Sequence, residues 1–370
     1  MNEDKSVRYH RLKRRCAVAS VAITAVLLAA LLATGLSSSI ADAARRLART
    51  PGLRYSPLAI AIDVTVLATL RETLTFPLSL YQGFLLERRY GLSLERFGGW
   101  LRDHAKAVGL SLILGIAGAE AVYFAVRLSP AWWWLLAAAA FVLATAGVAR
   151  IAPVVLLPMF YRFTPLERRS LRSRLESLSA RAGIPVLGVY EWALGEKSRR
   201  ANAALVGTGA SRRIIISDTL LAEYSDDEIE VILAHEIAHH VHHDILAGIV
   251  AESVLLVAAF CAAAATLGAW GPRLGLEGQA DIAGLPLLLL VGGGVSLLAT
   301  PIVNALSRRN ERRADRYALA LTGHAGAFIS AMRRLGNQNM AEEQPSTMAV
   351  LLFHSHPPIE QRIETARTFL

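Results

Sequence analysis

The 370-residue chain is 54% hydrophobic and has a formal net charge of +9. Its apolar residues form blocks of about twenty, long enough to cross roughly 30 Å of hydrocarbon as helices, and this pattern excludes a simple soluble enzyme. A nucleic-acid-binding module is also excluded, because the arginines flank the apolar blocks instead of forming a basic stripe in a recognisable module.

The first apolar block, residues 16–36, follows a basic N-terminal segment and precedes Ala41-Asp42-Ala43, which resembles a signal-peptide cleavage site. Its apolar run of about twenty residues exceeds the roughly 7–15 of a signal peptide. We therefore expect a retained membrane anchor. Cleavage is the alternative, and it would leave the orientation of the later spans unchanged.

Six blocks are predicted to span the membrane. The arginine-rich N-terminus, residues 82–106 and residues 161–244 are placed in the cytoplasm by the positive-inside rule. The loop near Arg45–Arg54, which carries four arginines, is the one poor fit. Both termini and the polar domain then face the cytoplasm. The predicted spans are residues 16–36, 57–80, 107–128, 132–157, 245–270 and 282–306.

The polar domain after the fourth span has readable local elements. Thr164-Pro165-Leu166-Glu167 predicts a capped helix start, and the helix is expected to run to about Ala182. Residues 186–192 predict a strand. Ala203–Val206 and Arg213–Ser217 predict a hairpin around a glycine-containing turn.

A helix with metal-binding spacing follows. Ser225-Asp226-Asp227-Glu228 predicts a capping box that opens it. Residues four apart share one helix face, so His235 and His239 can bind a single ion. Glu236 can reach a water at that ion as a general base. The alternative is a solvated helix that carries histidines by chance, and the capping box beside a membrane span disfavours it.

Catalytic zinc requires a third protein ligand. The metzincin pattern needs glycine and histidine three and six residues past His239, where His242 and Ile245 stand, so that pattern fails. A glutamate from a second helix remains, and Glu311 follows the last predicted span. Asp315, four residues later on the same face, can accept the second N–H of a ligating histidine.

Two predicted spans separate His239 from Glu311. A hairpin of two membrane helices returns the chain to the side that it left, so both halves of the metal site meet at the cytoplasmic face. The predicted domains are an N-terminal membrane domain of four spans (residues 1–160) and a zinc peptidase domain (residues 161–370) with an inserted two-span hairpin (about 245–306).

Other histidines surround these motifs. His240, His242 and His243 are expected to shape or hydrogen-bond the helix end, and a second metal is the weaker alternative. His356 precedes Pro357-Pro358. It could donate a hydrogen bond to a tetrahedral oxyanion or be an ordinary turn residue, and the two alternatives stay open.

From about Thr75 onward, the sequence resembles the integral-membrane zinc peptidases typified by the type I CAAX prenyl protease. The segments that carry the likeness follow one another in family order. They are Phe76-Pro77-Leu78-Ser79-Leu80-Tyr81 with Phe84, Glu87 and Tyr90-Gly91; Phe163-Thr164-Pro165-Leu166; Asn202-Ala203; Asp218-Thr219-Leu220-Leu221; the His235 motif; Glu311 with Asp315; and His356-Pro357-Pro358 with Arg362.

Together with the six predicted spans and their orientation, the resemblance implies a mainly α, polytopic membrane protein of about six spans with a cytoplasmic, gluzincin-type zinc peptidase domain that contains a small β-sheet. It implies one Zn²⁺ per chain and an extended substrate paired with the strand after Asn202. The implied zinc ligands are His235, His239 and Glu311, with Glu236 as base, His356 assisting the transition state, Asp315 and Arg362 in support, and Asn202 and Ala203 binding substrate.

Family members enclose a large water-filled chamber. A chamber would account for charged residues inside apolar blocks, which are costly unless they face water or partners. A few buried ion pairs would account for them as well. Eukaryotic members have seven spans, one more than expected here, and Arg200-Ala201 stands where the family has a histidine. The charged residues are Asp63, Arg71, Glu72, Glu120 and Glu252.

We therefore expect a membrane-embedded zinc metalloendopeptidase in a bacterial inner membrane, with its active site on the cytoplasmic side. Its expected partners are the lipid bilayer and peptide or protein substrates, membrane-associated or lipidated ones included, and not nucleic acid. A quality-control protease is the alternative within the same chemistry. A six-span transporter or channel with an incidental metal site is the alternative from another class.

Overall fold

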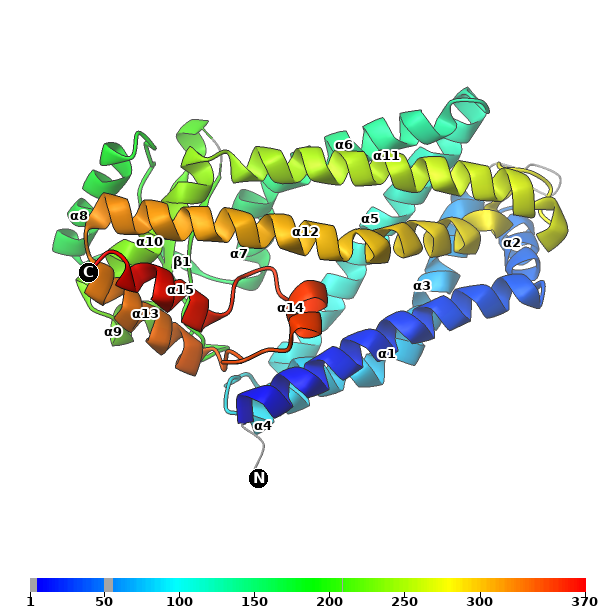
Figure 1. Ribbon diagram of the computed structural model, residues 1–370. Helices are drawn as coiled ribbons and strands as arrows, with labels where there is room; N and C mark the ends of the chain where they lie inside the picture. The colour runs from blue at the N-terminus through cyan, green and yellow to red at the C-terminus, as the bar shows by residue number, and fades with distance from the viewer. Residues whose placement is uncertain (1–4, 50–55, 208) are drawn as a thin grey trace.

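A computed structural model of the chain describes residues 5–49, 56–207 and 209–370. Long helices lie along one another, and a smaller mixed domain sits at one end of the molecule (Figure 1). This arrangement confirms the expected mainly α fold with a small sheet. The core of the mixed domain and the core of the helical bundle are two separate apolar clusters.

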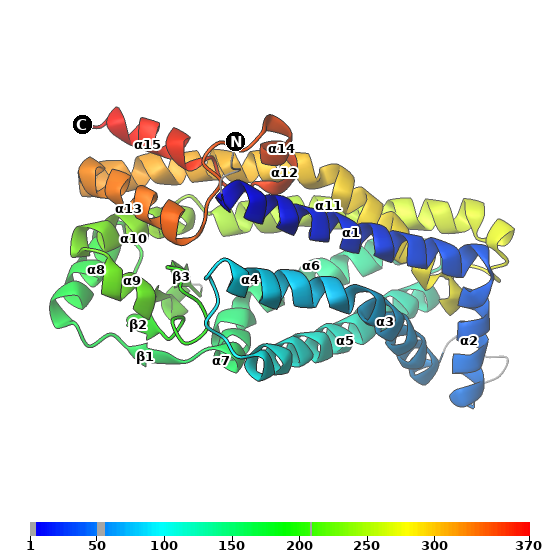
Figure 2. The ribbon, with the colours of Figure 1, turned by 90° about the horizontal axis from the view of Figure 1, so that it is seen from below.

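Five segments are long and apolar enough to cross a membrane: α1 (Lys5–Ala33), α5 (Phe97–Leu128), α6 (Trp133–Ile151), α11 (Asp244–Trp270) and a fifth that contains α12 (Leu285–Thr322). They correspond to five of the six predicted spans. The remaining predicted span, residues 57–80, coincides with α3 (Pro57–Leu80), which packs against α1 and α5 (Figure 2). This helix carries Asp63, Arg71 and Glu72, and it is not among the five apolar segments.

A short helix that the sequence analysis missed, α2 (Leu36–Leu47), runs across the end of the bundle (Figure 2). Gly35, with φ 73°, makes the turn from α1 into it. Arg45 in this helix pairs with Asp42 at 2.9 Å and with Asp281 at 2.6 Å. Part of the arginine charge that fitted the predicted topology poorly is therefore neutralised within the fold. Residues 50–55 of that loop lie outside the described residues.

The sheet of the mixed domain has the order β1-β2-β4-β3. β3 (Ala203–Val206) and β4 (Arg213–Ser217) form the predicted hairpin, with Ala204 opposite Ile215. The Ser217 N–H donates to the Asn202 carbonyl at 2.9 Å. Because antiparallel hydrogen bonds alternate, Ala203 and Leu205 turn their backbone groups to the free edge of the sheet.

The predicted helix start at Thr164 is wrong. β1 (Phe163–Pro165) pairs with β2 (Val189–Trp192), Thr164 lying opposite Glu191, and the Leu166 N–H donates to the Val189 carbonyl at 3.0 Å. These long-range bonds satisfy backbone groups that a helix would otherwise have used. The helix, α8 (Arg169–Arg181), begins only after them, and the predicted strand is shortened to β2.

The capping box is confirmed. The Glu228 N–H donates to Ser225 Oγ at 3.3 Å, and the Ser225 N–H donates to Glu228 Oε2 at 2.8 Å, at the start of α10 (Asp226–Val241). Ile229, Leu233 and Ile237 on this helix are fully buried. The apolar side chains therefore anchor α10 in the core of the mixed domain.

The last membrane helix does not end where the predicted span ends. α12 continues unbroken for 38 residues and carries Glu311 and Asp315 beyond the bilayer-length segment. The other helical segments are η1 (Tyr81–Leu85), α4 (Leu86–Arg89), η2 (Ala152–Leu156), α7 (Leu157–Phe160), η3 (Gly209–Ser211), α9 (Asp218–Glu223), η4 (Pro272–Leu274), η5 (Ile282–Gly284), α13 (Ala325–Gln338), α14 (Thr347–Phe353) and α15 (Ile359–Arg367).

Candidate metal centre

Two helices bring three potential ligands together. α10 carries His235 and His239, and α12 carries Glu311. The His235 Nε2 atom lies 3.2 Å from Glu311 Oε2, and the His239 Nε2 atom lies 3.4 Å from Glu311 Oε1. Potential ligand atoms of the three residues lie within 4.8 Å of one another. The structure thus places the predicted ligand set at one point.

A carboxylate holds the other nitrogen of each imidazole. His235 Nδ1 lies 2.9 Å from Asp315 Oδ1, and His239 Nδ1 lies 2.8 Å from Asp244 Oδ2. When each Nδ1 carries a proton, both Nε2 lone pairs are free to face Glu311. Two oriented imidazoles and one carboxylate, with a fourth position left open, suit catalytic zinc. The residues present therefore fit that ion.

Sequence reasoning missed Asp244. It is the first residue of α11, which begins after His243 breaks the helix with φ 55°. A periodic search along α10 could not find it, because the break changes the direction of the chain between His239 and Asp244. The signal for Asp244 in the sequence is the presence of an acidic residue five positions after the second histidine.

Arg362 from α15 supports Asp315. Its Nε donates to Asp315 Oδ2 at 2.9 Å, and an Nη donates to Oδ1 at 2.6 Å. The same Nη lies 3.3 Å from His235 Nδ1. The orientation of the His235 imidazole on α10 thus depends on Asp315 of α12, and Arg362 of α15 in turn holds Asp315 in place.

The electrostatics favour positive charge at the centre. Burial lowers the pKa of His235, but hydrogen bonds with Asp315 and Glu311 outweigh burial and raise this pKa to about 9. Burial also raises the pKa of Glu236, more than the neighbouring imidazoles lower it. A carboxyl group with a raised pKa is better suited to accept a proton.

The structure brings His356 to the metal centre as well. It lies in the loop between α14 and α15, with its Nδ1 2.8 Å from Glu311 Oε2 and its side chain 61% exposed. Asn202 precedes the edge strand β3, and Ala203 begins it. Both of these predicted substrate-binding residues therefore lie at the sheet edge that is open to pairing.

The neighbouring histidines have three different environments. His240 Nε2 lies 2.8 Å from the Leu205 carbonyl oxygen on β3, His242 packs edge-on against the Tyr317 ring, and His243 makes the left-handed break. In the described ranges, none of them belongs to a group of potential metal ligands. His240 instead links the metal-binding helix to the edge strand.

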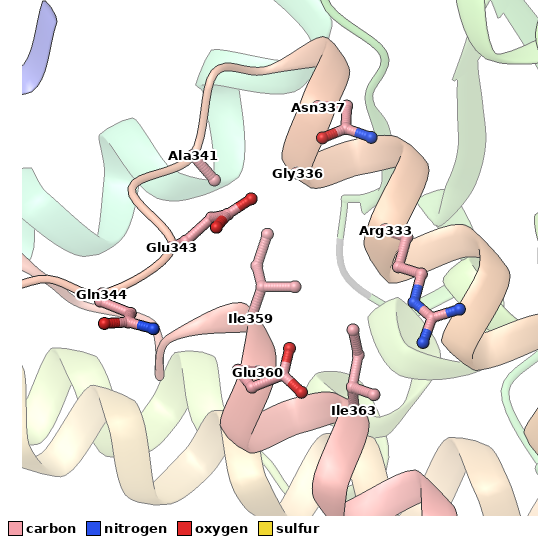
Figure 3. A pocket seen from close by; sticks show the side chains of 9 residues that line it. All are labelled: Arg333, Gly336, Asn337, Ala341, Glu343, Gln344, Ile359, Glu360 and Ile363. Atoms are coloured by element: carbon pink, nitrogen blue, oxygen red, sulfur yellow. The ribbon is translucent and has the colours of Figure 1, made fainter. Parts of the chain in front are cut away.

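A cavity of about 370 Å³ lies between α13 and α15, next to the helix that supplies Arg362 (Figure 3). Glu343, Glu360 and Arg333 border it, and none of the metal-site residues lines it. A Cβ atom on Gly336 would come within 2.8 Å of Ile359 Cδ1. The glycine therefore lets α15 pack closely against α13, which helps to place Arg362.

Comparisons with known proteins identify a family for this chain. Residues 165–369 match the model for peptidase family M48, and residues 2–162 match a model described as CAAX prenyl protease N-terminal, five membrane helices. The uncharacterized metalloprotease YhfN of Bacillus subtilis is 29% identical over 313 residues, which cover 82% of this chain and 72% of that protein.

A CAAX prenyl protease 1 homolog of Oryza sativa subsp. japonica is 28% identical over 290 residues, covering 78% of this chain and 68% of that protein. The crystal structure of S. mikatae Ste24p matches with a TM-score of 0.84 and 22% identity, covering 98% of this chain and 88% of the other. This structural match shows a shared fold.

Proposed function

The chain belongs to peptidase family M48, and from this membership we propose that His235, His239 and Glu311 bind one zinc ion and that Glu236 is the catalytic base. The observation that carries the proposal is the convergence of both Nε2 atoms on Glu311 while carboxylates hold both Nδ1 atoms. Asp315 and Asp244 accept the Nδ1 protons, and Arg362 keeps Asp315 ionised and oriented.

The protein is a multi-pass membrane metalloendopeptidase, as the family, its relatives and the membrane-length helices indicate. A transporter with an incidental metal site is not favoured, because the family match includes both the peptidase domain and the membrane domain. The quality-control alternative is not favoured either, since the relatives reported above include a CAAX prenyl protease homolog that covers most of the chain.

Zinc, when bound, supplies a Lewis acid that polarises a carbonyl and makes water easier to deprotonate. Glu236 takes the proton from the attacking water and passes it to the leaving amine. His356 lies beside Glu311 and donates a hydrogen bond to the oxygen that becomes negatively charged during attack.

The substrate is a peptide or protein segment that adds to the sheet at β3. Ala203 turns its N–H and C=O to this edge, where no hydrogen bond from the described residues reaches them, as pairing with an extended backbone requires. Asn202 lies at the end of the same edge. Membrane-associated and lipidated substrates belong to the proposal, since several relatives are named CAAX prenyl proteases.

The active site is proposed to lie on the cytoplasmic side of a bacterial inner membrane. Basic flanks support this orientation, and 35 arginines against four lysines suit a GC-rich bacterial genome. We place the domain boundary near residue 160, with α11 and α12 as the hairpin inserted into the peptidase domain. α1 is proposed to be retained, because Arg14 pairs with Glu342 of that domain at 2.5 Å.

The proposal is tested by purifying the protein in detergent, measuring bound zinc and comparing peptide cleavage with a Glu236→Gln variant. We expect about one zinc per chain in both proteins and a loss of cleavage of roughly 10²–10⁴-fold in the variant, because the general base is removed. Glu364→Gln, which changes an exposed glutamate, is the matched control. Unchanged cleavage in Glu236→Gln, or wild-type protein without zinc, contradicts the assignment.

A further inference from the structure

A groove with a volume of about 420 Å³ begins at the metal centre and runs between α11 and α12. Glu236 and His239 lie at one end. Ile245 and Ala251 on α11 face Val303 and Leu306 on α12 across it. Gly248 also lines the groove, and a Cβ atom added there would meet no atom within 4 Å. The groove therefore has apolar walls and free space directly beside the reacting atoms.

Four carboxylates line this groove: Glu236, Asp244, Glu252 and Glu311. Three of them have a task at the metal centre. Asp244 pairs with His239 and Arg313, Glu311 contacts the ligating imidazoles, and Glu236 is the base. The Glu252 side chain is exposed to the groove and makes no hydrogen bond or ion pair with any described residue. No lysine or arginine is among the residues that line the groove.

The position of Glu252 makes a partner favourable when a substrate fills the groove and excludes water. It lies eight residues past Asp244, about 12 Å along an apolar helix that is long enough to span the membrane. A carboxylate at that depth is expensive unless it faces water or a cation. Since no lysine or arginine of the described residues lines the groove, the basic side chain of a bound molecule can supply the missing partner.

We propose that this groove is a specificity pocket that receives a lysine or arginine side chain of the substrate near the scissile bond, and that Glu252 binds its charged end. The aliphatic stem of either residue suits the apolar walls. Ser307 and Asn310 on α12 also line the groove and carry oxygen acceptors for the remaining N–H groups. The inference rests on the proposed function, because the metal centre must cleave the peptide that the pocket selects.

The first test maps cleavage sites in a library of ten-residue peptides that is randomised at the central positions. The wild type is expected to favour Lys or Arg about tenfold over norleucine at one position near the cut, a typical value for a charge pair that is partly shielded from water. Glu252→Gln should remove this preference, and Glu252→Lys should replace it with a preference for Asp or Glu. Glu72→Gln, another carboxylate in a membrane-domain helix but outside the groove, should keep the wild-type preference.

The second test does not require cleavage. In a Glu236→Gln background, binding of a lysine peptide is compared with binding of the same peptide carrying norleucine, by fluorescence anisotropy. The lysine peptide should bind about tenfold more tightly, and the difference should vanish when Glu252→Gln is added. Gly248→Leu, which fills the groove, should exclude lysine and still admit glycine or alanine at the same substrate position. This variant tests the pocket independently if the Glu252→Gln protein folds poorly.

The outcomes separate the two ideas. If the wild type cleaves peptides but shows no basic preference, or if Glu252→Gln retains that preference, the pocket is overturned and the peptidase assignment stands. If no cleavage occurs but lysine peptides bind through Glu252, the pocket stands and the peptidase assignment fails. Equal binding of the lysine and norleucine peptides overturns the pocket whatever the cleavage result.

Discussion

The carboxylate of Asp315 lies 2.9 Å from Nδ1 of His235, and it is almost completely buried. Arg362 holds the same carboxylate through two hydrogen bonds. The direction in which His235 presents Nε2 is thus set by residues from two other helices. Metal affinity should depend on this contact even though Asp315 is not one of the proposed ligands.

Asp315→Asn is expected to weaken zinc binding roughly 10–100-fold, because an amide cannot orient and polarise the imidazole as a carboxylate does. Competition with a zinc chelator measures the affinity, and cleavage should return in large part at saturating zinc. Asp226→Asn, which alters a half-exposed aspartate at the start of α10, is the control. An unchanged zinc affinity in Asp315→Asn would show that Arg362 and Glu311 orient His235 without it.

His240 should act on substrate binding and not on the chemical step. Its Nε2 donates to the Leu205 carbonyl on the edge strand at 2.8 Å, so His240→Phe leaves a buried acceptor unpaired at a cost of about 1–3 kcal/mol. We expect KM to rise several-fold and kcat to change less, because β3 pairs with the substrate backbone. His242→Phe is the matched control. A fall in kcat at constant KM would place His240 in the chemistry instead.

Glu228 should make stability depend on pH. Burial raises the pKa of Glu228, but hydrogen bonds from Ser330 and Ser225 and the charge of Arg334 together lower it below the ordinary 4.5. The ionised group therefore stabilises the folded protein above pH 4.5, and this stabilisation is lost as the pH falls through the lowered pKa.

Glu228→Gln should accordingly lower the free energy of unfolding at pH 7 by roughly 1–2 kcal/mol, which appears as a lower apparent melting temperature. The difference from wild type should shrink once the pH is well below 4.5. Thermal unfolding in detergent at a series of pH values checks this, with Glu364→Gln as the exposed control. A difference that is equally large in acid would mean that Glu228 acts through packing and not through its charge.

A cluster around Arg200 ties the first span to the segment that enters the edge strand. An Arg200 Nη lies 2.6 Å from the Tyr9 hydroxyl and 2.9 Å from Glu87 Oε2. Tyr9→Phe and Glu87→Gln should each lower stability and raise KM modestly. Their effects should be non-additive by about 0.5–3 kcal/mol, because both contact the same guanidinium. Additive effects in a double-mutant cycle would show that the two contacts are independent.

Much of the site was predictable because it is local. His235, Glu236 and His239 depend on helical spacing, the Ser225–Glu228 box depends on residues three apart, and the β3–β4 hairpin joins strands that are close in sequence. Spans can be recognised in the same way, from continuous apolar runs. Helical period, cap chemistry and hydrophobic length are properties of neighbouring residues, so the sequence by itself determined them.

Tertiary structure decided the rest. Thr164 became part of a strand because β2 was present to pair with it, and Asp244 reached His239 because a left-handed residue turned the chain. The intramembrane charges could be read from sequence as chamber-facing or as ion-paired. Packing gave these residues different environments, since Glu72 meets His104 at 2.8 Å while Glu252 meets no cation among the described residues. Contacts between distant segments depend on how whole helices pack, and no local pattern encodes that packing.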